Sequence, residues 1–172
     1  QLLNHVVIVG YGRVGKHLVD VLETLSIPML VIEADSERTN ILNQKRIPTL
    51  YGDAGNSEIL RYAYLEHASL LVTTVPDETS AIMIVTAARD INPKLPILAR
   101  AATEQGVREL ADLGATTYAY QQSRQEGLAD EQFLTDLEGD RVLDRLRWKE
   151  AEQAIPLLEK QLLDDPANFR AR

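Results

Sequence analysis

The stretch His5-Val-Val-Ile-Val-Gly-Tyr-Gly-Arg-Val-Gly-Lys16 decides the fold. Its first half is a run of β-branched residues that ends in glycine, which is typical of a buried strand. Its second half places Gly10, Gly12 and Gly15 at GxGxxG spacing, and apolar residues then follow at helical spacing. We therefore expect a strand, a tight glycine turn and a helix.

The same alternation of apolar runs and helical patches continues through residue 137. The predicted strands cover residues 5–10, 28–33, 49–51, 70–75, 97–100 and 117–120. The predicted helices between them cover residues 14–25, 36–45, 57–64, 79–90 and 104–113, with Ser36 as the N-cap of the second. Parallel strands need a crossover, and a helix in each gap supplies one. The sequence predicts an α/β fold, a doubly wound parallel six-stranded sheet with helices on both faces.

A C-terminal helical extension follows the predicted sheet. We expect one domain over residues 1–137, including a helix over 123–137, and a charged helical tail over 138–172 with Pro156 interrupting its second helical run. A solvated helix or a linker is the alternative for the tail. The chain starts at Gln1 rather than Met, so we expect a fragment of a longer protein.

Composition excludes several classes of function. The chain has 18 basic and 26 acidic residues, a net charge of 18 − 26 = −8, which disfavours nucleic-acid binding. The absence of cysteine excludes disulfides, thiolate zinc sites and cysteine nucleophiles. His5, His17 and His67 lack metal-ligand spacing, so we expect no metal site.

The glycine loop predicts a nucleotide site. In a dinucleotide-binding turn Gly10 allows the tight bend, Gly12 lets the backbone approach the pyrophosphate, and Gly15 lets helix and strand pack closely. The phosphates would lie at the N-terminus of the helix, where its dipole favours anions. Glu33 ends the second predicted strand, where it would accept hydrogen bonds from ribose hydroxyls and repel a 2′-phosphate. This arrangement favours NAD or an adenine mononucleotide over NADP.

Two motifs typical of enzymes are incomplete in this sequence. Gly10, Gly15 and Lys16 fit the phosphate loop GxxxxGK[ST], but His17 stands where that motif needs a hydroxyl. None of the tyrosines is followed by lysine four residues later, as a single-domain reductase would require. We expect no catalytic residues.

Asp53 and Asp77 lie in predicted loops at one edge of the sheet, where they could bind a base or ribose or could instead cap their own loops.

Six motifs in register carry a family resemblance. They are the glycine loop, Val31-Ile-Glu33, Tyr51-Gly-Asp-Ala54, Glu58-Ile-Leu-Arg-Tyr-Ala63, Val75-Pro-Asp77 and Leu98-Ala-Arg-Ala101. Together they resemble the RCK/KTN family, also called the TrkA-N domain, over about residues 5–137. The resemblance is closest to the cytoplasmic regulatory domain of Kef-type monovalent cation:proton antiporters, and it implies a Rossmann-like fold.

The resemblance also implies a function and a set of binding residues. Members of this family bind AMP, ADP, ATP or NAD(H) and gate an attached potassium channel or antiporter. By position, the implied phosphate ligands are Gly10, Gly12, Arg13, Val14 and Gly15, with Thr74 and Arg100 on the phosphate side, Glu33 at the ribose, and Asp53 and Ala54 at the adenine. Arg13 and Arg100 could instead form surface ion pairs.

Family members pair as homodimers, which here would involve the helix over 123–137 and its apolar residues Leu128, Phe133, Leu134 and Leu137. The alternative is that this helix packs on its own sheet. A membrane antiporter domain is expected before residue 1, which makes the chain the cytoplasmic domain of an inner-membrane transporter. Gln121-Gln122 replaces a proline common in the family, and the second lobe of channel-linked relatives is missing.

Other function classes stay open at this point. One is a stand-alone NAD-dependent oxidoreductase or redox-sensing domain, which the glycine loop with Glu33 would also serve. A second is the regulatory subunit of a potassium channel or uptake system. A third is a scaffold that only dimerises.

Overall fold

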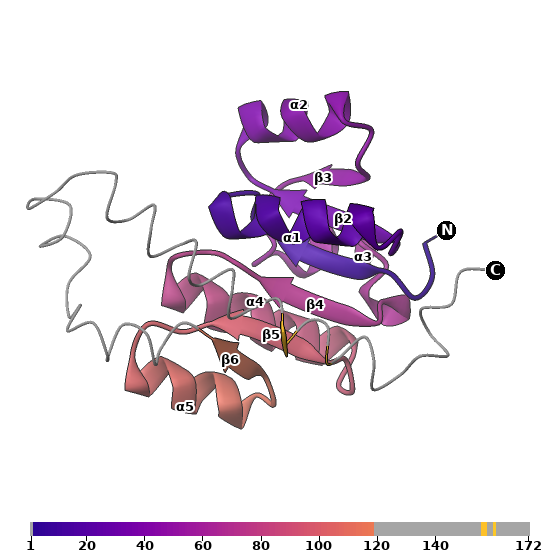
Figure 1. Ribbon diagram of the computed structural model, residues 1–172. Helices are drawn as coiled ribbons and strands as arrows, with labels where there is room; N and C mark the ends of the chain where they lie inside the picture. Colours follow the sequence, from indigo (N-terminus) through magenta and orange to yellow (C-terminus); the bar gives the residue numbers. More distant parts are fainter. Residues whose placement is uncertain (1, 119–155, 158–159, 161–172) are drawn as a thin grey trace, which may run out of the picture.

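A six-stranded parallel sheet forms the centre of the molecule in the computed structural model, which describes residues 2–118, 156, 157 and 160 (Figure 1). The strands are β1 (Val6–Val9), β2 (Met29–Glu33), β3 (Thr49–Tyr51), β4 (Leu70–Thr73), β5 (Ile97–Arg100) and β6 (Thr116–Tyr118). Their order across the sheet is β3-β2-β1-β4-β5-β6. The predicted α/β fold with six parallel strands is confirmed.

β1 lies at the centre of the sheet, paired with β2 on one side and β4 on the other. Val9 stands opposite Ile32 of β2 and Thr73 of β4, so these strands end together at one edge. The chain builds outward from β1 through β2 to β3, then crosses back to β4 and continues the other way. The carboxyl edge between β1 and β4 is therefore the topological switch point, where doubly wound sheets bind ligands.

Within residues 2–118, five helices and a 3₁₀ turn divide between the two faces of the sheet. They are α1 (Arg13–Thr24), α2 (Ser36–Gln44), α3 (Ser57–Tyr62), η1 (Leu65–His67), α4 (Glu78–Ile91) and α5 (Glu104–Asp112). Leu18 of α1 and Leu42 of α2 belong to one buried cluster. Leu60 of α3, Val85 of α4 and Leu110 of α5 belong to the other. Both faces of the sheet are thus covered, as the continuous apolar strands predict.

Some predicted boundaries are wrong for local reasons. The N-cap of α2 is Asp35 rather than Ser36, because the Asp35 carboxylate accepts the backbone N–H of Arg38 at 2.9 Å. α3 ends at Tyr62 rather than Tyr64, because Tyr64 has a φ of +54°, in the left-handed region, and is the N-cap of η1. β4 ends at Thr73 rather than at residue 75.

The helix predicted over 123–137 lies outside the described residues, as does most of the tail. Within the tail, Pro156, Leu157 and Lys160 have helical backbone. The residues just before Pro156 lie outside the described part of the chain, so the interruption of a helical run at Pro156 stays a prediction. Leu157 is partly buried against the cluster that contains α1. None of the helices in the described part of the chain has the length and apolarity that a membrane span requires.

Candidate functional site

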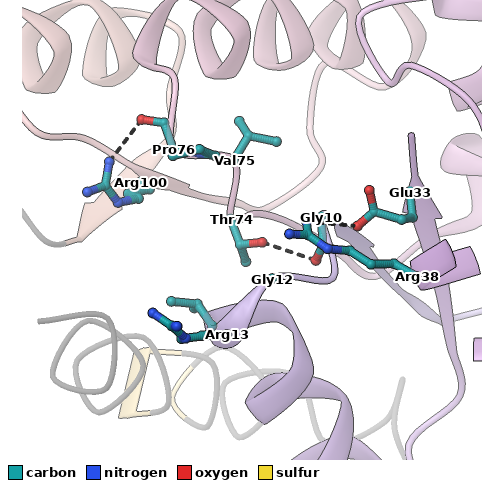
Figure 2. Close-up of a pocket in the computed structure, with 10 residues that line it drawn as sticks. Gly10, Gly12, Arg13, Glu33, Arg38, Thr74, Val75, Pro76 and Arg100 are labelled. Atoms are coloured by element: carbon teal, nitrogen blue, oxygen red, sulfur yellow. Dashed lines mark hydrogen bonds and ion pairs between the residues drawn. The ribbon is translucent and has the colours of Figure 1, made fainter. Parts of the chain in front are cut away.

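A pocket of about 280 Å³ opens at the switch point between β1 and β4 (Figure 2). The glycine loop forms its floor, and the ends of β2, β4 and β5 contribute the walls. The residues that line it are Gly10, Gly12, Arg13, Val14, Glu33, Arg38, Thr74, Val75, Pro76 and Arg100. The pocket therefore lies where the fold predicts a ligand site.

At each of the three positions in the loop, a side chain would have a different steric consequence. Gly10 has a φ of +94°, and a Cβ there would lie 2.8 Å from the Thr74 hydroxyl. A Cβ on Gly15 would lie 1.9 Å from the Gly10 carbonyl oxygen, so helix and strand can approach only if residue 15 is glycine. A Cβ on Gly12 would meet no atom within 4 Å. Gly12 thus borders open space, where a ligand could approach the backbone.

The N-terminus of α1 differs from those of the other described α-helices. Its N-cap, Gly12, offers no side-chain hydrogen bond, and its first turn holds no acidic residue. The other four are capped by the side chains of Asp35, Asn56, Asp77 and Thr103, and each has a glutamate in its first turn. The partial positive charge at the start of α1 is therefore left to an external anion.

Glu33 is buried and holds two loops together. Its Oε2 accepts the backbone N–H of Tyr11 at 2.6 Å, and its Oε1 accepts that of Asp35 at 2.9 Å. An ionised carboxylate has about four acceptor sites, so these bonds leave room for a ribose hydroxyl. Glu33 can brace the loops and bind a ligand at once.

Three arginines reach the pocket from three different elements (Figure 2). Arg13 begins α1, and Arg38 lies in the first turn of α2 with its Nη1 3.9 Å from Glu33 Oε2. Arg100 ends β5, is only 7% exposed, and donates from Nη1 to the Pro76 carbonyl at 3.0 Å. With Glu33, the lining side chains carry a formal charge of 3 − 1 = +2 in a chain whose net charge is −8. The pocket concentrates positive charge and suits an anion.

The structure brings most of the predicted binding residues together but leaves three out of the pocket lining: Gly15, Asp53 and Ala54. Gly15 serves the packing of α1, and Ala54 is buried in the core. The Asp53 carboxylate accepts the backbone N–H of Gly55 at 2.8 Å, which is the loop-capping alternative. Their contact with a ligand stays a prediction.

Asp77 caps the N-terminus of helix α4. Its carboxylate accepts the hydroxyl and the backbone N–H of Ser80 at the start of α4, and both bonds lower the pKa of Asp77.

Thr74 follows β4 and forms part of the pocket wall. Its hydroxyl donates to the Val9 and Gly10 carbonyls, 2.9 and 3.1 Å away. The wall beside the glycine loop is thereby fixed to β1.

Sequence reasoning missed Arg38, Val75 and Pro76 as pocket residues. A signal for Arg38 was present, because it stands in the first turn of the helix that follows the strand ending in Glu33. Val75 and Pro76 were recognised only as part of a motif. Among the described residues, no group of three or more His, Cys, Asp or Glu side chains could hold a metal ion.

Comparison with known proteins identifies the family. Residues 6–121 match the TrkA-N domain. The chain belongs to the TrkA-N domain family. Its sequence is 39% identical over 115 residues to the putative cation/proton antiporter YbaL of Escherichia coli, covering 67% of this chain and 21% of that protein. The crystal structure of the YbaL TrkA-N domain matches at a TM-score of 0.65 with 38% identity, over 67% of this chain and 86% of that domain.

Two further similar structures were solved with nucleotides bound. GsuK bound to ADP matches at a TM-score of 0.57 with 28% identity, over 66% of this chain and 29% of GsuK. The C-terminal domain of a Shewanella denitrificans Kef protein in its AMP-bound form matches at 0.59 with 23% identity, over 87% of this chain and 96% of that domain. The predicted resemblance to this family is confirmed. This TrkA-N domain spans about a fifth of the length of YbaL.

Proposed function

We propose that this TrkA-N domain is a nucleotide-sensing regulatory domain that gates a potassium or other monovalent cation:proton antiporter. It would bind an adenine nucleotide or NAD(H) in the pocket at the switch point. One observation carries the proposal: three guanidinium groups and the uncapped N-terminus of α1 converge on a single hollow. Oriented dipoles and cations at one point are how proteins bind phosphate.

The pocket residues suggest how a nucleotide would lie. Its phosphates would contact the backbone at Gly12, with Arg13 and Arg100 on either side. Its ribose would lie toward Glu33, which keeps free acceptor sites. ADP and AMP in the solved relatives support an adenine nucleotide for this chain, and the adenine would extend from the ribose toward β3, near Asp53 and Ala54.

A regulatory role fits the pocket better than catalysis. The two lining groups that could act as base or nucleophile are already engaged, Glu33 by two backbone N–H groups and the Thr74 hydroxyl by backbone carbonyls. We further propose that the domain is attached to a membrane antiporter part before residue 1, works on the cytoplasmic side and acts as a homodimer. The similarity to the putative cation/proton antiporter YbaL supports the antiporter context. A ligand would shift gating only as far as its affinity differs between two domain arrangements.

Calorimetric titration and thermal unfolding of the 172-residue chain test the binding step, with AMP, ADP, ATP, NAD⁺ and NADH as separate ligands. A true ligand at about 100 times its Kd stabilises the fold by about 2.7 kcal/mol. Gly12→Val is the matched variant, because a side chain there meets no protein atom but enters the ligand space. It should fold normally and lose binding.

Two results would contradict the proposal. If none of these ligands binds, the domain does not sense adenine nucleotides. If Gly12→Val binds as tightly as the parent chain, the site lies elsewhere. Turnover of NADH by the purified chain would instead support the oxidoreductase alternative.

A further inference from the structure

We propose that Glu78, which does not line the pocket, is a positioning residue for the nucleotide site, because it holds the loop that orients Arg100. The inference rests on the proposed function. Glu78 is the first residue of α4, and the loop just before it, residues 74–76, forms one wall of the pocket. Arg100 ends the neighbouring strand β5 and lines the same pocket. The loops that follow β4 and β5 therefore meet beside the proposed ligand.

Hydrogen bonds connect these two loops in both directions. Arg100 Nη1 donates to the Pro76 carbonyl at 3.0 Å (Figure 2). Glu78 reaches the other way, and its Oε2 accepts the backbone N–H groups of Ala102 and Thr103 at 2.8 and 3.0 Å. Its Oε1 accepts the Thr103 hydroxyl at 2.5 Å. The contacts close a ring, the loop clasp, which consists of Pro76, Glu78, Arg100, Ala102 and Thr103.

Gly106 leaves the space that the Glu78 carboxylate fills. A Cβ at position 106 would lie 2.0 Å from the carboxyl carbon and 2.2 and 2.3 Å from its two oxygens. Gly106 is buried in the first turn of α5, where alanine is the better helix former. Its backbone N–H donates to the Thr103 hydroxyl oxygen at 3.0 Å. The hydroxyl that caps α5 is thus the one that donates to Glu78, which fixes the carboxylate in the clasp.

The loop clasp fixes the direction of the Arg100 guanidinium. Arg100 is a pocket residue, and its bond to Pro76 depends on where the loop before α4 lies. Glu78 anchors that loop to the residues directly after Arg100. A binding group keeps its geometry only when neighbouring hydrogen bonds hold it. Without Glu78, the loop before α4 can move relative to β5, and the guanidinium loses its fixed orientation.

Charge alone predicts the opposite effect of Glu78. This acid lies two residues from the pocket residue Pro76. Removing its negative charge would strengthen the binding of an anion there, because like charges repel. Loss of the clasp would weaken the binding of the same anion. The sign of the change in affinity therefore separates positioning from electrostatics.

Calorimetric titration of the 172-residue chain with ADP tests the proposal. Glu78→Ala removes the clasp, and Gly106→Ala displaces the carboxylate but keeps its charge, since the end of the Glu78 side chain can swing away. We expect each variant to bind ADP about threefold to tenfold more weakly than the parent. Glu78→Gln keeps an acceptor for the two N–H groups and should restore most of the affinity. Glu104→Ala, at an exposed acid in the first turn of α5, is the charge control and should not weaken binding.

Two results of the titration would overturn the positioning role. One is unchanged or tighter ADP binding by Glu78→Ala, which is what charge alone predicts. The other is parental affinity in Gly106→Ala, because this variant opens the clasp without a change of charge. Thermal unfolding of each variant, with a midpoint near that of the parent, ensures that the comparison concerns folded protein.

A measurement without ligand separates this inference from the proposed function. Exchange of the Arg100 Nε–H with water, followed by NMR and assigned with Arg100→Lys, reports how firmly the guanidinium is held. We expect at least about tenfold faster exchange in Glu78→Ala and Gly106→Ala, and parental exchange in Glu104→Ala. Equal exchange in the parent and Glu78→Ala would overturn the positioning role whether or not ADP binds. Faster exchange in a chain whose parent binds no nucleotide would overturn the proposed function and keep the clasp.

Discussion

The backbone N–H of Tyr11 donates to Glu33 Oε2 at 2.6 Å, which ties the glycine loop after β1 to the end of β2. The second oxygen of the same carboxylate accepts the N–H of Asp35, just before α2. One buried acid thus fixes the floor of the pocket before any ligand arrives. A preorganised loop loses less conformational entropy on binding, which favours affinity.

Glu33→Gln should therefore weaken both the fold and the site. A glutamine has one acceptor oxygen, so either Tyr11 or Asp35 would face an NH₂ group and lose its bond. We expect the free energy of unfolding to fall by about 1–3 kcal/mol, with a loss of nucleotide affinity. Urea denaturation and calorimetric titration measure the two effects. Glu37→Gln is the control, an exposed acid in the first turn of α2; equal behaviour of both variants would contradict the bracing role.

Gly15→Ala and Gly12→Ala should separate folding from binding. The new methyl at position 15 would lie 1.9 Å from the Gly10 carbonyl oxygen, and backbone cannot easily give way. Overpacking of this kind costs about 1–3 kcal/mol or more. The methyl at position 12 meets no protein atom, so that variant should keep its stability and lose affinity. Thermal unfolding with and without ligand checks both, and a stable Gly15→Ala would refute the packing argument.

The sequence allowed six parallel strands in one sheet and most of the pocket lining to be predicted, because these depend on local patterns. Apolar runs and a glycine turn specify strand, loop and helix, and parallel strands bring their carboxyl ends to one edge. Arg13, Glu33, Thr74 and Arg100 therefore meet at that edge as predicted. Their contact with a nucleotide stays a prediction.

Features that depend on side-chain geometry could not be predicted. Several nearby residues could cap α2, and only the hydrogen bond from Arg38 N–H selects Asp35 over Ser36. The same capped turn directs the Arg38 side chain back toward Glu33, so its place in the pocket follows from three-dimensional structure. The packing of Leu157 joins segments that are distant in sequence, and no local pattern encodes such a contact.

Arg38→Ala should weaken nucleotide binding without harming the fold. The side chain is 52% exposed and lies 3.9 Å from Glu33, so its ion pair adds little stability in the free protein. A bound anion would gain a partner that is partly shielded from water, and we expect its loss to reduce affinity by about threefold to tenfold. Titration at low and high salt measures the effect, which should shrink as salt rises.

Arg108→Ala supplies the matched control for this charge change. Arg108 is 73% exposed on α5, where it pairs with Glu104, and it does not line the pocket. An equal loss of affinity in both variants would show that net charge, rather than the position of Arg38, governs binding. Arg38→Lys should fall between parent and alanine, because lysine keeps the charge but not the planar fork.

His5 should make the fold less stable in mild acid. Its ring is fully buried, Nε2 donates to the Ala63 carbonyl at 2.8 Å, and Nδ1 has no hydrogen-bond partner among the described residues. Burial lowers the pKa of His5 below 6.5, and the nearby His67 lowers it further, against the opposing effect of the Ala63 bond. Protonation would place a charged N–H in the core without an acceptor.

The direction of the pH effect follows from proton binding. Below pH 6.5 the unfolded chain takes up a proton at His5 that the folded chain resists, so stability falls as the pH drops through that value. His5→Gln keeps a donor for Ala63 and removes the titration, so its free energy of unfolding should depend less on pH between about 5 and 7. His67→Gln, at an exposed position, should retain most of the dependence. Urea denaturation across this pH range measures the free energy of unfolding of each variant. Identical pH dependence for the parent and His5→Gln would show that His5 does not cause the loss of stability in acid.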